Sequence, residues 1–304
     1  MHGPTCDHHH QHPATYNRAF AIGVALNVGY VVLEAGYGFA VNSLSLLADA
    51  GHNLSDVLGL LLAWGAHHLS QWKPTDRRTY GWRSSSILAA LVNSCVLLAA
   101  VGAIGWEAIR RFAVPEAVPG DVVIWVAGAG VVVNTATALL FLKGRRHDLN
   151  IQGAFLHMAA DAGVSVAVVL GGWGMLATGK LWIDPMLSLA VAVVILWGTW
   201  GLLRDSTNLA LHAVPRTIDP NGVRQFLLER PGVEAIHDLH IWAMSTTETA
   251  LTAHLIRPDG DDNDRFLAET SAELFERFGI DHTTLQLERE LHAELCRQAP
   301  EGTL

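Results

Sequence analysis

The sequence predicts an α-helical membrane protein, in which a bundle of six membrane-spanning helices is followed by a small α+β domain. Half of the 304 residues are apolar and only 16% are charged, whereas about a quarter are charged in a typical soluble domain. Six segments are apolar over the length of about 20 residues that a bilayer requires. Charge is also segregated: residues 205–304 hold eight Lys/Arg against eighteen Asp/Glu, while residues 1–204 hold twelve against eleven.

The six predicted spans are rich in alanine, valine, leucine and glycine. Small residues let helices approach closely in a membrane. A soluble helical bundle would need a polar face on every helix, and the third, fourth and sixth segments show almost none. The predicted spans are residues 18–40, 44–69, 85–107, 121–143, 152–177 and 183–203.

Basic residues predict the orientation of the spans. The connection between the second and third spans carries four Lys/Arg, and the connection between the fourth and fifth carries three. The positive-inside rule places both connections in the cytoplasm, although Arg110 and Arg111 in an opposite loop weaken the contrast. With six spans, both termini are then cytoplasmic, and we expect a multi-pass protein of the bacterial cytoplasmic (inner) membrane.

After residue 204 the pattern becomes that of a soluble domain. Two amphipathic segments, 221–230 and 264–279, predict helices, and three alternating segments, 237–244, 248–258 and 282–290, predict strands. Their order, α-β-β-α-β, predicts a small sandwich. Its acidic balance argues against nucleic acid as a partner. The predicted domain boundaries are a His-rich cytoplasmic tail (1–16), a membrane domain (17–204), a soluble domain (205–291) and a C-terminal tail (292–304).

The N-terminal segment MHGPTCDHHHQHP could capture metal loosely, but it could also be a disordered tail or an expression tag. It does not look like a cleaved signal peptide, because no basic region precedes an apolar core. The three cysteines, Cys6, Cys95 and Cys296, are widely separated. We therefore expect neither a disulfide framework nor a cysteine-only metal site.

A histidine is followed four residues later by an aspartate in two of the apolar segments: His52 with Asp56, and His157 with Asp161. Residues four apart share one face of a helix, and ionisable groups in a lipid core are costly and usually functional. Two imidazoles and two carboxylates form a tetrahedral nitrogen and oxygen ligand set that suits Zn²⁺. The alternative is that each pair is a buried contact that holds its own helix in register.

Such a site predicts metal transport coupled to protons. Zinc binds neutral imidazole and ionised carboxylate, so metal and protons compete for the same groups, and histidine titrates in the physiological range. An enzyme such as an intramembrane metallohydrolase is disfavoured, because there is no HExxH motif and four protein ligands leave no position for an activated water. A metal-sensing membrane receptor without net transport remains the alternative.

Two further acids lie in the predicted spans. Asp49, three residues before His52, either orients the imidazole, carries a proton or lies near the outer membrane surface. Glu34 is either a pore-lining group or a hydrogen-bonding group between helices.

The soluble domain has its own cluster of candidate ligands. It predicts one or two cytoplasmic zinc sites that sense metal or stabilise the domain, with ordinary strand histidines as the alternative. His240 in particular could be a structural residue of its turn. The candidates are His237, His240, His254, His282 and Glu288.

The chain resembles the cation diffusion facilitator family, and within it the zinc-exporting subgroup. The resemblance covers nearly the whole chain. It is carried by SLSLLADAGHNLSD, TYGWRSSSILAALVN, the second His-x-x-x-Asp pair, the Asp184–Pro185 step and VEAIHDLHIWAMS. It implies a homodimer in the lipid bilayer, with a ferredoxin-like cytoplasmic domain that binds metal and dimerises. It also implies export of Zn²⁺ from the cytosol in exchange for H⁺ by alternating access, and Cd²⁺, Co²⁺ or Ni²⁺ could also fit.

Carried over position by position, the resemblance places the family's transport site on the same four residues: His52, Asp56, His157 and Asp161. His237 and His254 likewise match ligand positions of the cytoplasmic domain.

Two regions depart from the family pattern. Arg78 and Trp82 stand where some relatives bind a second metal in a loop, so we expect no metal there. Gln286 and Glu288 stand where some relatives have a His-x-Asp pair, so Glu288 can still be a ligand while a full binuclear centre lacks its histidine.

Overall fold

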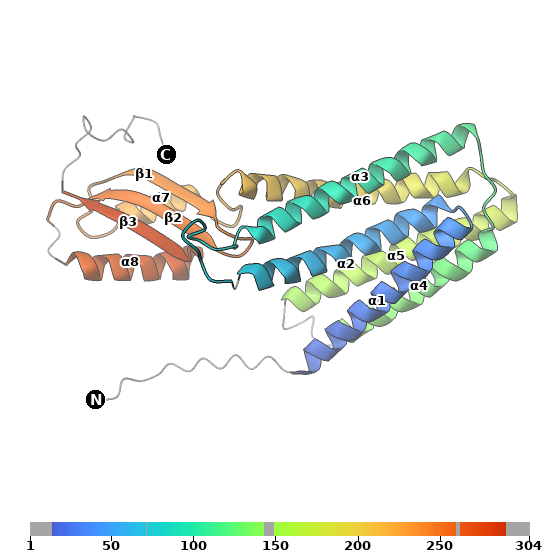
Figure 1. Cartoon of the computed structure of the whole chain (residues 1–304), viewed down its shortest axis with the longest axis horizontal. Coiled ribbons are helices and arrows are strands. Elements are labelled where there is room, and N and C mark those ends of the chain that lie inside the picture. The colour runs from blue at the N-terminus through green and yellow to red at the C-terminus, as the bar shows by residue number, and fades with distance from the viewer. Residues whose placement is uncertain (1–13, 71, 143–148, 260–261, 290–304) are drawn as a thin grey trace. The chain divides into compact units, whose positions relative to one another are not determined.

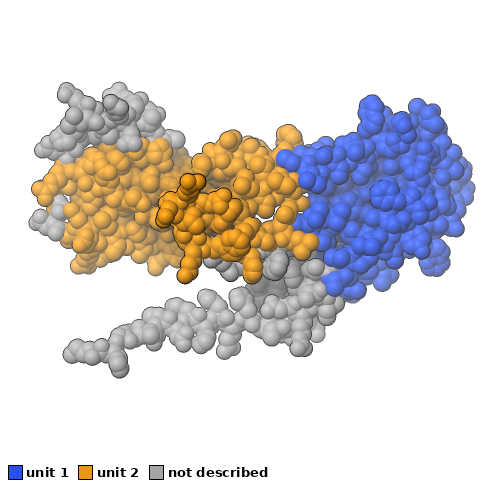
Figure 2. Space-filling model, in the orientation of Figure 1, with its two compact units in different colours: residues 1–60, 95–199 blue, residues 61–94, 200–304 orange. Residues whose placement is uncertain are grey.

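The computed structural model describes residues 14–70, 72–142, 149–259 and 262–289 (Figure 1). The chain divides into two compact units, residues 1–60 with 95–199 and residues 61–94 with 200–304 (Figure 2), and each is described here by itself. The elements are α1 (Ala14–Ala40), α2 (Leu44–Ser70), α3 (Ser85–Ala113), α4 (Gly120–Phe141), α5 (Leu149–Thr178), α6 (Ile183–Ala210), α7 (Pro220–Leu228), β1 (Ala235–Ala243), β2 (Thr249–Ile256), α8 (Asn263–Phe278) and β3 (His282–Glu288).

The six long helices correspond to the six predicted spans, but two of them run further than predicted. α3 continues to Ala113 and α6 to Ala210, because the charged residues taken as span ends do not interrupt helical hydrogen bonding. α6 ends just before His212, which has the left-handed φ of 60°. Within the described residues, α3, α4, α5 and α6 are long and apolar enough to cross a membrane. Spanning by α1 and α2 stays a prediction.

Large apolar side chains cover the outside of the first unit. Trp197 is 86% exposed, Trp125 80%, Phe39 76% and Trp106 72%. Soluble monomers rarely expose large apolar patches. The three exposed tryptophans lie on α3, α4 and α6, which are long and apolar enough to cross a membrane.

A buried acid of α6 holds the start of α2. Asp184, with no exposed surface, accepts hydrogen bonds from the hydroxyls of Ser43 (2.8 Å) and Ser45 (2.6 Å) and from the amide nitrogens of Leu44 (2.9 Å) and Ser45 (3.3 Å). The first amide groups of a helix have no partner within that helix. A carboxylate at this end also interacts favourably with the helix dipole.

Arg111 connects this acid to the chain before α2. Its guanidinium group donates to the carbonyl oxygen (2.5 Å) and side-chain oxygen (2.7 Å) of Asn42, and it lies 4.0 Å from Asp184. Glu107 and Glu116 also pair with it, at 3.3 and 3.5 Å. Arg111 is thus a buried charge that its acidic neighbours neutralise. This structural role explains why a basic residue occurs beside a loop where the positive-inside rule does not expect one.

In the second unit, α7 and α8 pack on one face of a three-stranded sheet. The strand order is β1-β2-β3; β1 is antiparallel to β2, and β2 is parallel to β3. The element order α7-β1-β2-α8-β3 confirms the predicted α-β-β-α-β pattern. Between helices and sheet lies an apolar core that includes Val223, Phe226, Leu251, Leu255 and Leu274. His254 alternates along β2 with the core residues Ala253 and Leu255 and therefore lies on the opposite, open face.

The connection between α2 and α3 belongs to the same unit and packs against the sheet. The Ser84 hydroxyl donates to the Met244 carbonyl oxygen (3.1 Å), and the Thr246 amide donates to the Ser86 hydroxyl (3.0 Å). Arg83 forms a 3.2 Å ion pair with Glu248. The turn between β1 and β2 is therefore attached to the first turn of α3.

Candidate metal sites

The His-x-x-x-Asp pairs of α2 and α5 face each other in the first unit. His52 Nε2 lies 3.3 Å from Asp161 Oδ1, and His157 Nε2 lies 3.1 Å from Asp56 Oδ2. Ligand atoms of His52, Asp56 and Asp161 all lie within 4.8 Å of one another. The two imidazole rings are 6.1 Å apart, centre to centre. We call these four residues the helix quartet.

The contacts within the helix quartet are mostly crossed between helices. Each histidine pairs with the aspartate of the other helix, and His157 lies further, at 3.7 Å, from Asp161 of its own helix. The alternative of two separate pairs, each bracing its own helix, does not describe this arrangement. Ligand atoms of His52, Asp56 and Asp161 instead gather within 4.8 Å of one another, and His157 contacts both aspartates from beside them. The two nitrogens and two carboxylates form a donor set that suits a tetrahedral divalent cation.

The members of the helix quartet differ in burial. Asp161 is 1% exposed, His52 19%, Asp56 33% and His157 43%. An isolated carboxylate at 1% exposure is costly without a positive partner. Asp161 therefore depends on the imidazoles or on a cation for its stability, while His157 and Asp56 remain reachable from outside the bundle.

Asp49 is fully buried within the protein. The hydroxyl of Ser165 donates to its Oδ2 (3.1 Å), and the side-chain amide of Asn53 lies 3.5 Å from its Oδ1. These contacts within the described residues go to other polar groups rather than to the imidazole of His52. They do not show the orienting role that the spacing allowed.

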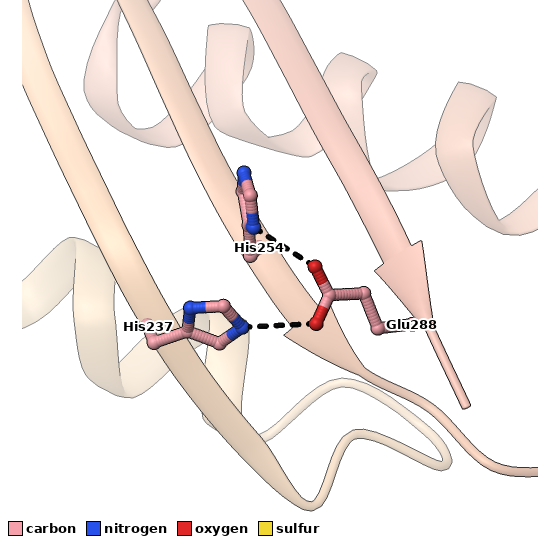
Figure 3. Close-up of side chains that lie close together, drawn as sticks. All are labelled: His237, His254 and Glu288. Carbon is pink, nitrogen blue, oxygen red and sulfur yellow. Dashed lines mark hydrogen bonds and ion pairs between the residues drawn. The ribbon is translucent and has the colours of Figure 1, made fainter. Parts of the chain in front are cut away.

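A second cluster lies on the open face of the sheet and comprises His237, His254 and Glu288, which we call the sheet triad (Figure 3). His237 of β1 stands directly opposite His254 of β2. The carboxylate of Glu288 lies between them, 3.1 Å from His237 Nε2 and 2.9 Å from His254 Nδ1. In β3, Gln286 pairs directly with His254. Glu288 follows two residues later and lies on the same face of the sheet.

A β-bulge separates His240 from the sheet triad. Asp238 has a φ of 52°, and the strand register shifts between His237 and His240. A bulge inserts one residue and re-aims the side chains beside it. The exposed His240 consequently pairs with Asp238 at 2.8 Å. His282, at the other end of β3, packs its ring against Tyr80 at 5.7 Å. The structure thus gathers three of the five soluble-domain candidates.

Partial burial alone would raise the pKa of Glu288. Hydrogen bonds from His237 and Gln286, together with the charges of His237 and His254, outweigh that effect and lower the pKa below its usual value. A carboxylate with a lowered pKa stays ionised down to a lower pH than in the unfolded chain. Glu288 is therefore an anionic candidate ligand already in place at neutral pH.

Two other predictions concern the chain outside these clusters. Arg78 lies with its guanidinium 3.6 Å from the centre of the Trp82 ring, a stacked cation–π contact where some relatives place metal ligands. The N-terminal histidine run, residues 8–12, and Cys6 lie outside the described residues.

Long apolar helices that carry one set of candidate metal ligands, joined to an α/β domain with a second set, indicate an integral membrane protein. Comparison with known families makes the class specific. The cation efflux transmembrane domain matches residues 20–209, and the cytoplasmic domain of cation efflux proteins matches residues 215–290. The chain belongs to the cation efflux family, the cation diffusion facilitators, whose members are transporters rather than enzymes.

Curated relatives match over nearly their whole length. The cadmium, cobalt and zinc/H⁺-K⁺ antiporter of Bacillus subtilis is 33% identical, covering 95% of this chain and 96% of the relative. The zinc transporter ZitB of Escherichia coli is 34% identical over 92% of each chain. The metal cation efflux system protein CzcD of Cupriavidus metallidurans is 32% identical over 92% of this chain and 89% of that one.

Among solved structures, the metal-bound C-terminal domain of the CzcD transporter from the same organism is 35% identical. It covers 23% of this chain and 99% of that chain, with a TM-score of 0.22.

Proposed function

We propose that this protein exports Zn²⁺ from the cytosol in exchange for H⁺ by alternating access, with the helix quartet as the transport site. The observation that supports this best is the crossed pairing of His52 with Asp161 and of His157 with Asp56. A dication that replaces these contacts would take one nitrogen and one carboxylate from each helix. The cation would therefore bind only in conformations that keep the ligands of α2 and α5 this close together.

Exchange with protons follows from the chemistry of the ligands. Imidazole binds zinc when neutral and carboxylate when ionised, so a proton on either displaces the metal. Protons arriving from the far side of the membrane would release zinc there, and their loss to the cytosol would restore the site. Exchange of zinc for protons is supported by the relatives named as antiporters.

The remaining features complete the proposal. α1 and α2 also cross the membrane, so that six spans leave both termini in the cytoplasm of a bacterial inner membrane. The soluble domain is ferredoxin-like, binds zinc at the sheet triad and pairs two copies of the chain into a homodimer; the match to a cytoplasmic domain of cation efflux proteins supports this.

Transport is tested in proteoliposomes with an acidic interior and zinc outside. We expect zinc to accumulate inside while the interior becomes more alkaline, and we expect accumulation to slow when the proton gradient is removed. A receptor without net transport would bind zinc and accumulate none, which would contradict the proposal.

Metal choice depends on the balance of nitrogen and oxygen in the helix quartet. Ligation without a thiolate disfavours Cu⁺ and favours Zn²⁺, although Cd²⁺, Co²⁺ and Ni²⁺ fit a mixed set. His52→Asp replaces one imidazole by a carboxylate, and we expect the ratio of cadmium to zinc uptake to rise. His68→Asp, an exposed histidine of the same helix, is the matched control. An unchanged ratio in His52→Asp would rule out this assignment of selectivity.

The sheet triad is tested by zinc titration calorimetry on the full chain carrying Asp161→Asn, which silences the helix quartet. We expect His254→Ala to weaken the remaining site at least about 10-fold. Acidification should also weaken it, because protons occupy the imidazoles while Glu288 stays ionised. His240→Ala on the same strand is the control; an equal loss there would count against the sheet triad.

A further inference from the structure

A second group of ionisable side chains lies in the first unit, apart from the helix quartet. Glu34 of α1 and Asp49 of α2 both have zero exposed surface, and their carboxyl groups interact electrostatically. Polar residues from three helices surround the pair, since Tyr30 lies on α1, Asn53 on α2 and Ser165 on α5. Each of these three is itself at most 4% exposed.

Hydrogen-bond donors and acceptors do not balance around this pair. Tyr30 donates to Glu34 Oε1 (2.6 Å), Ser165 donates to Asp49 Oδ2 (3.1 Å), and Asn53 lies 3.5 Å from Asp49 Oδ1. Glu34 Oε2 is buried without a partner that donates to it. Four carboxylate oxygens therefore meet donors for only three of them. One more hydrogen, carried by one of the two carboxyl groups, completes the set.

Electrostatics leads to the same requirement. Within the described part of the chain, the groups that donate to the two carboxyls are Tyr30, Asn53 and Ser165, and none of them carries a charge. Two interacting carboxylates buried in an apolar bundle without a cationic partner are not both ionised, and such pairs share a proton. Further away, Asp49 interacts electrostatically with His52 and Asp161 of the helix quartet.

We propose that the Glu34–Asp49 pair is a proton-binding site, separate from the metal ligands, that carries one of the protons exchanged for each zinc ion. This rests on the proposed function. Asp49 lies one helical turn before His52, so a dication in the helix quartet favours the ionised form of Asp49 and weakens the hold of the pair on its proton. Zinc binding and proton loss are then linked without a shared ligand.

The backbone leaves room for this arrangement. A Cβ atom at Gly130 of α4 would overlap the hydroxyl of Tyr30 and would lie 2.9 Å from the hydroxyl of Ser165. Glycine at this position thus lets α4 pass close beside the two hydroxyls that donate to the carboxyl pair.

Glu34→Gln tests the proposal, because its amide can donate to Asp49 as the protonated acid does but cannot release a proton. In the proteoliposome assay, internal zinc and internal pH are followed together. We expect Glu34→Gln to transport zinc with one proton fewer per zinc than the wild type. Glu107→Gln, the same exchange at an acid outside the pair, should keep the wild-type ratio.

An unchanged ratio in Glu34→Gln would overturn the proposal. Infrared difference spectra upon zinc addition give a second readout that needs no transport. We expect loss of a protonated-carboxyl band in the wild type and no such band in Glu34→Gln; a band in both would overturn the proposal. Failure of the wild type to move zinc would refute the transport function and leave the infrared test intact.

Discussion

Asp161→Asn is expected to abolish zinc uptake while the protein still folds. Asp161 is the most buried member of the helix quartet and contacts both imidazoles, at 3.3 and 3.7 Å. Asparagine keeps its volume but loses the charge that balances a dication. Changes in groups that merely orient metal ligands weaken metal sites about 10- to 100-fold, so removal of a ligand charge should reduce uptake at least about 100-fold.

The matched control for this variant is Asp121→Asn, which alters an exposed aspartate in the first turn of α4. We expect its uptake to equal that of the wild type. Retained uptake by a folded Asp161→Asn protein, measured beside this control, would remove Asp161 from the transport site.

Asp184→Ala is expected to cause the largest loss of stability. The substitution leaves the two hydroxyls and two amide groups at the start of α2 without their acceptor, and it removes a negative charge near the buried Arg111. Breaking a buried charged network by removing one partner costs about 3–5 kcal/mol. The measurement is the thermal unfolding midpoint in detergent.

The control for this prediction is Asp121→Ala, a surface acid for which we expect a change within about 1 kcal/mol. Asp184→Asn should fall between the two, since its oxygen can still accept from the α2 start. Equal midpoints for Asp184→Ala and the wild type would show that α2 is positioned without this contact.

The helices and strands could be predicted because their patterns are local. Long apolar runs mark α3 to α6, and alternation marks β1, β2 and β3, as the structure has them. Helix ends could be predicted less well: the predicted spans end at residues 107 and 203, yet α3 and α6 continue through Arg110 and Arg204. A charged residue after an apolar run does not stop a helix.

The partners of individual side chains could not be predicted from local patterns. Spacing places His52 and Asp56 on one face, but the crossed contacts to α5 depend on how two helices pack. Asp184 contacts Ser43, which lies 141 positions away in the sequence. The bulge that separates His240 from the sheet triad requires a positive φ at Asp238, which the local sequence does not predict. These features arise from tertiary packing.

The most direct test of the central claim is a zinc-soaked structure with anomalous scattering recorded at the zinc edge. The account predicts one peak between α2 and α5, about 2.0–2.2 Å from a nitrogen of His52 and of His157 and from an oxygen of Asp56 and of Asp161. A peak at the sheet triad with none among these four residues, in a protein that transports zinc, would contradict it.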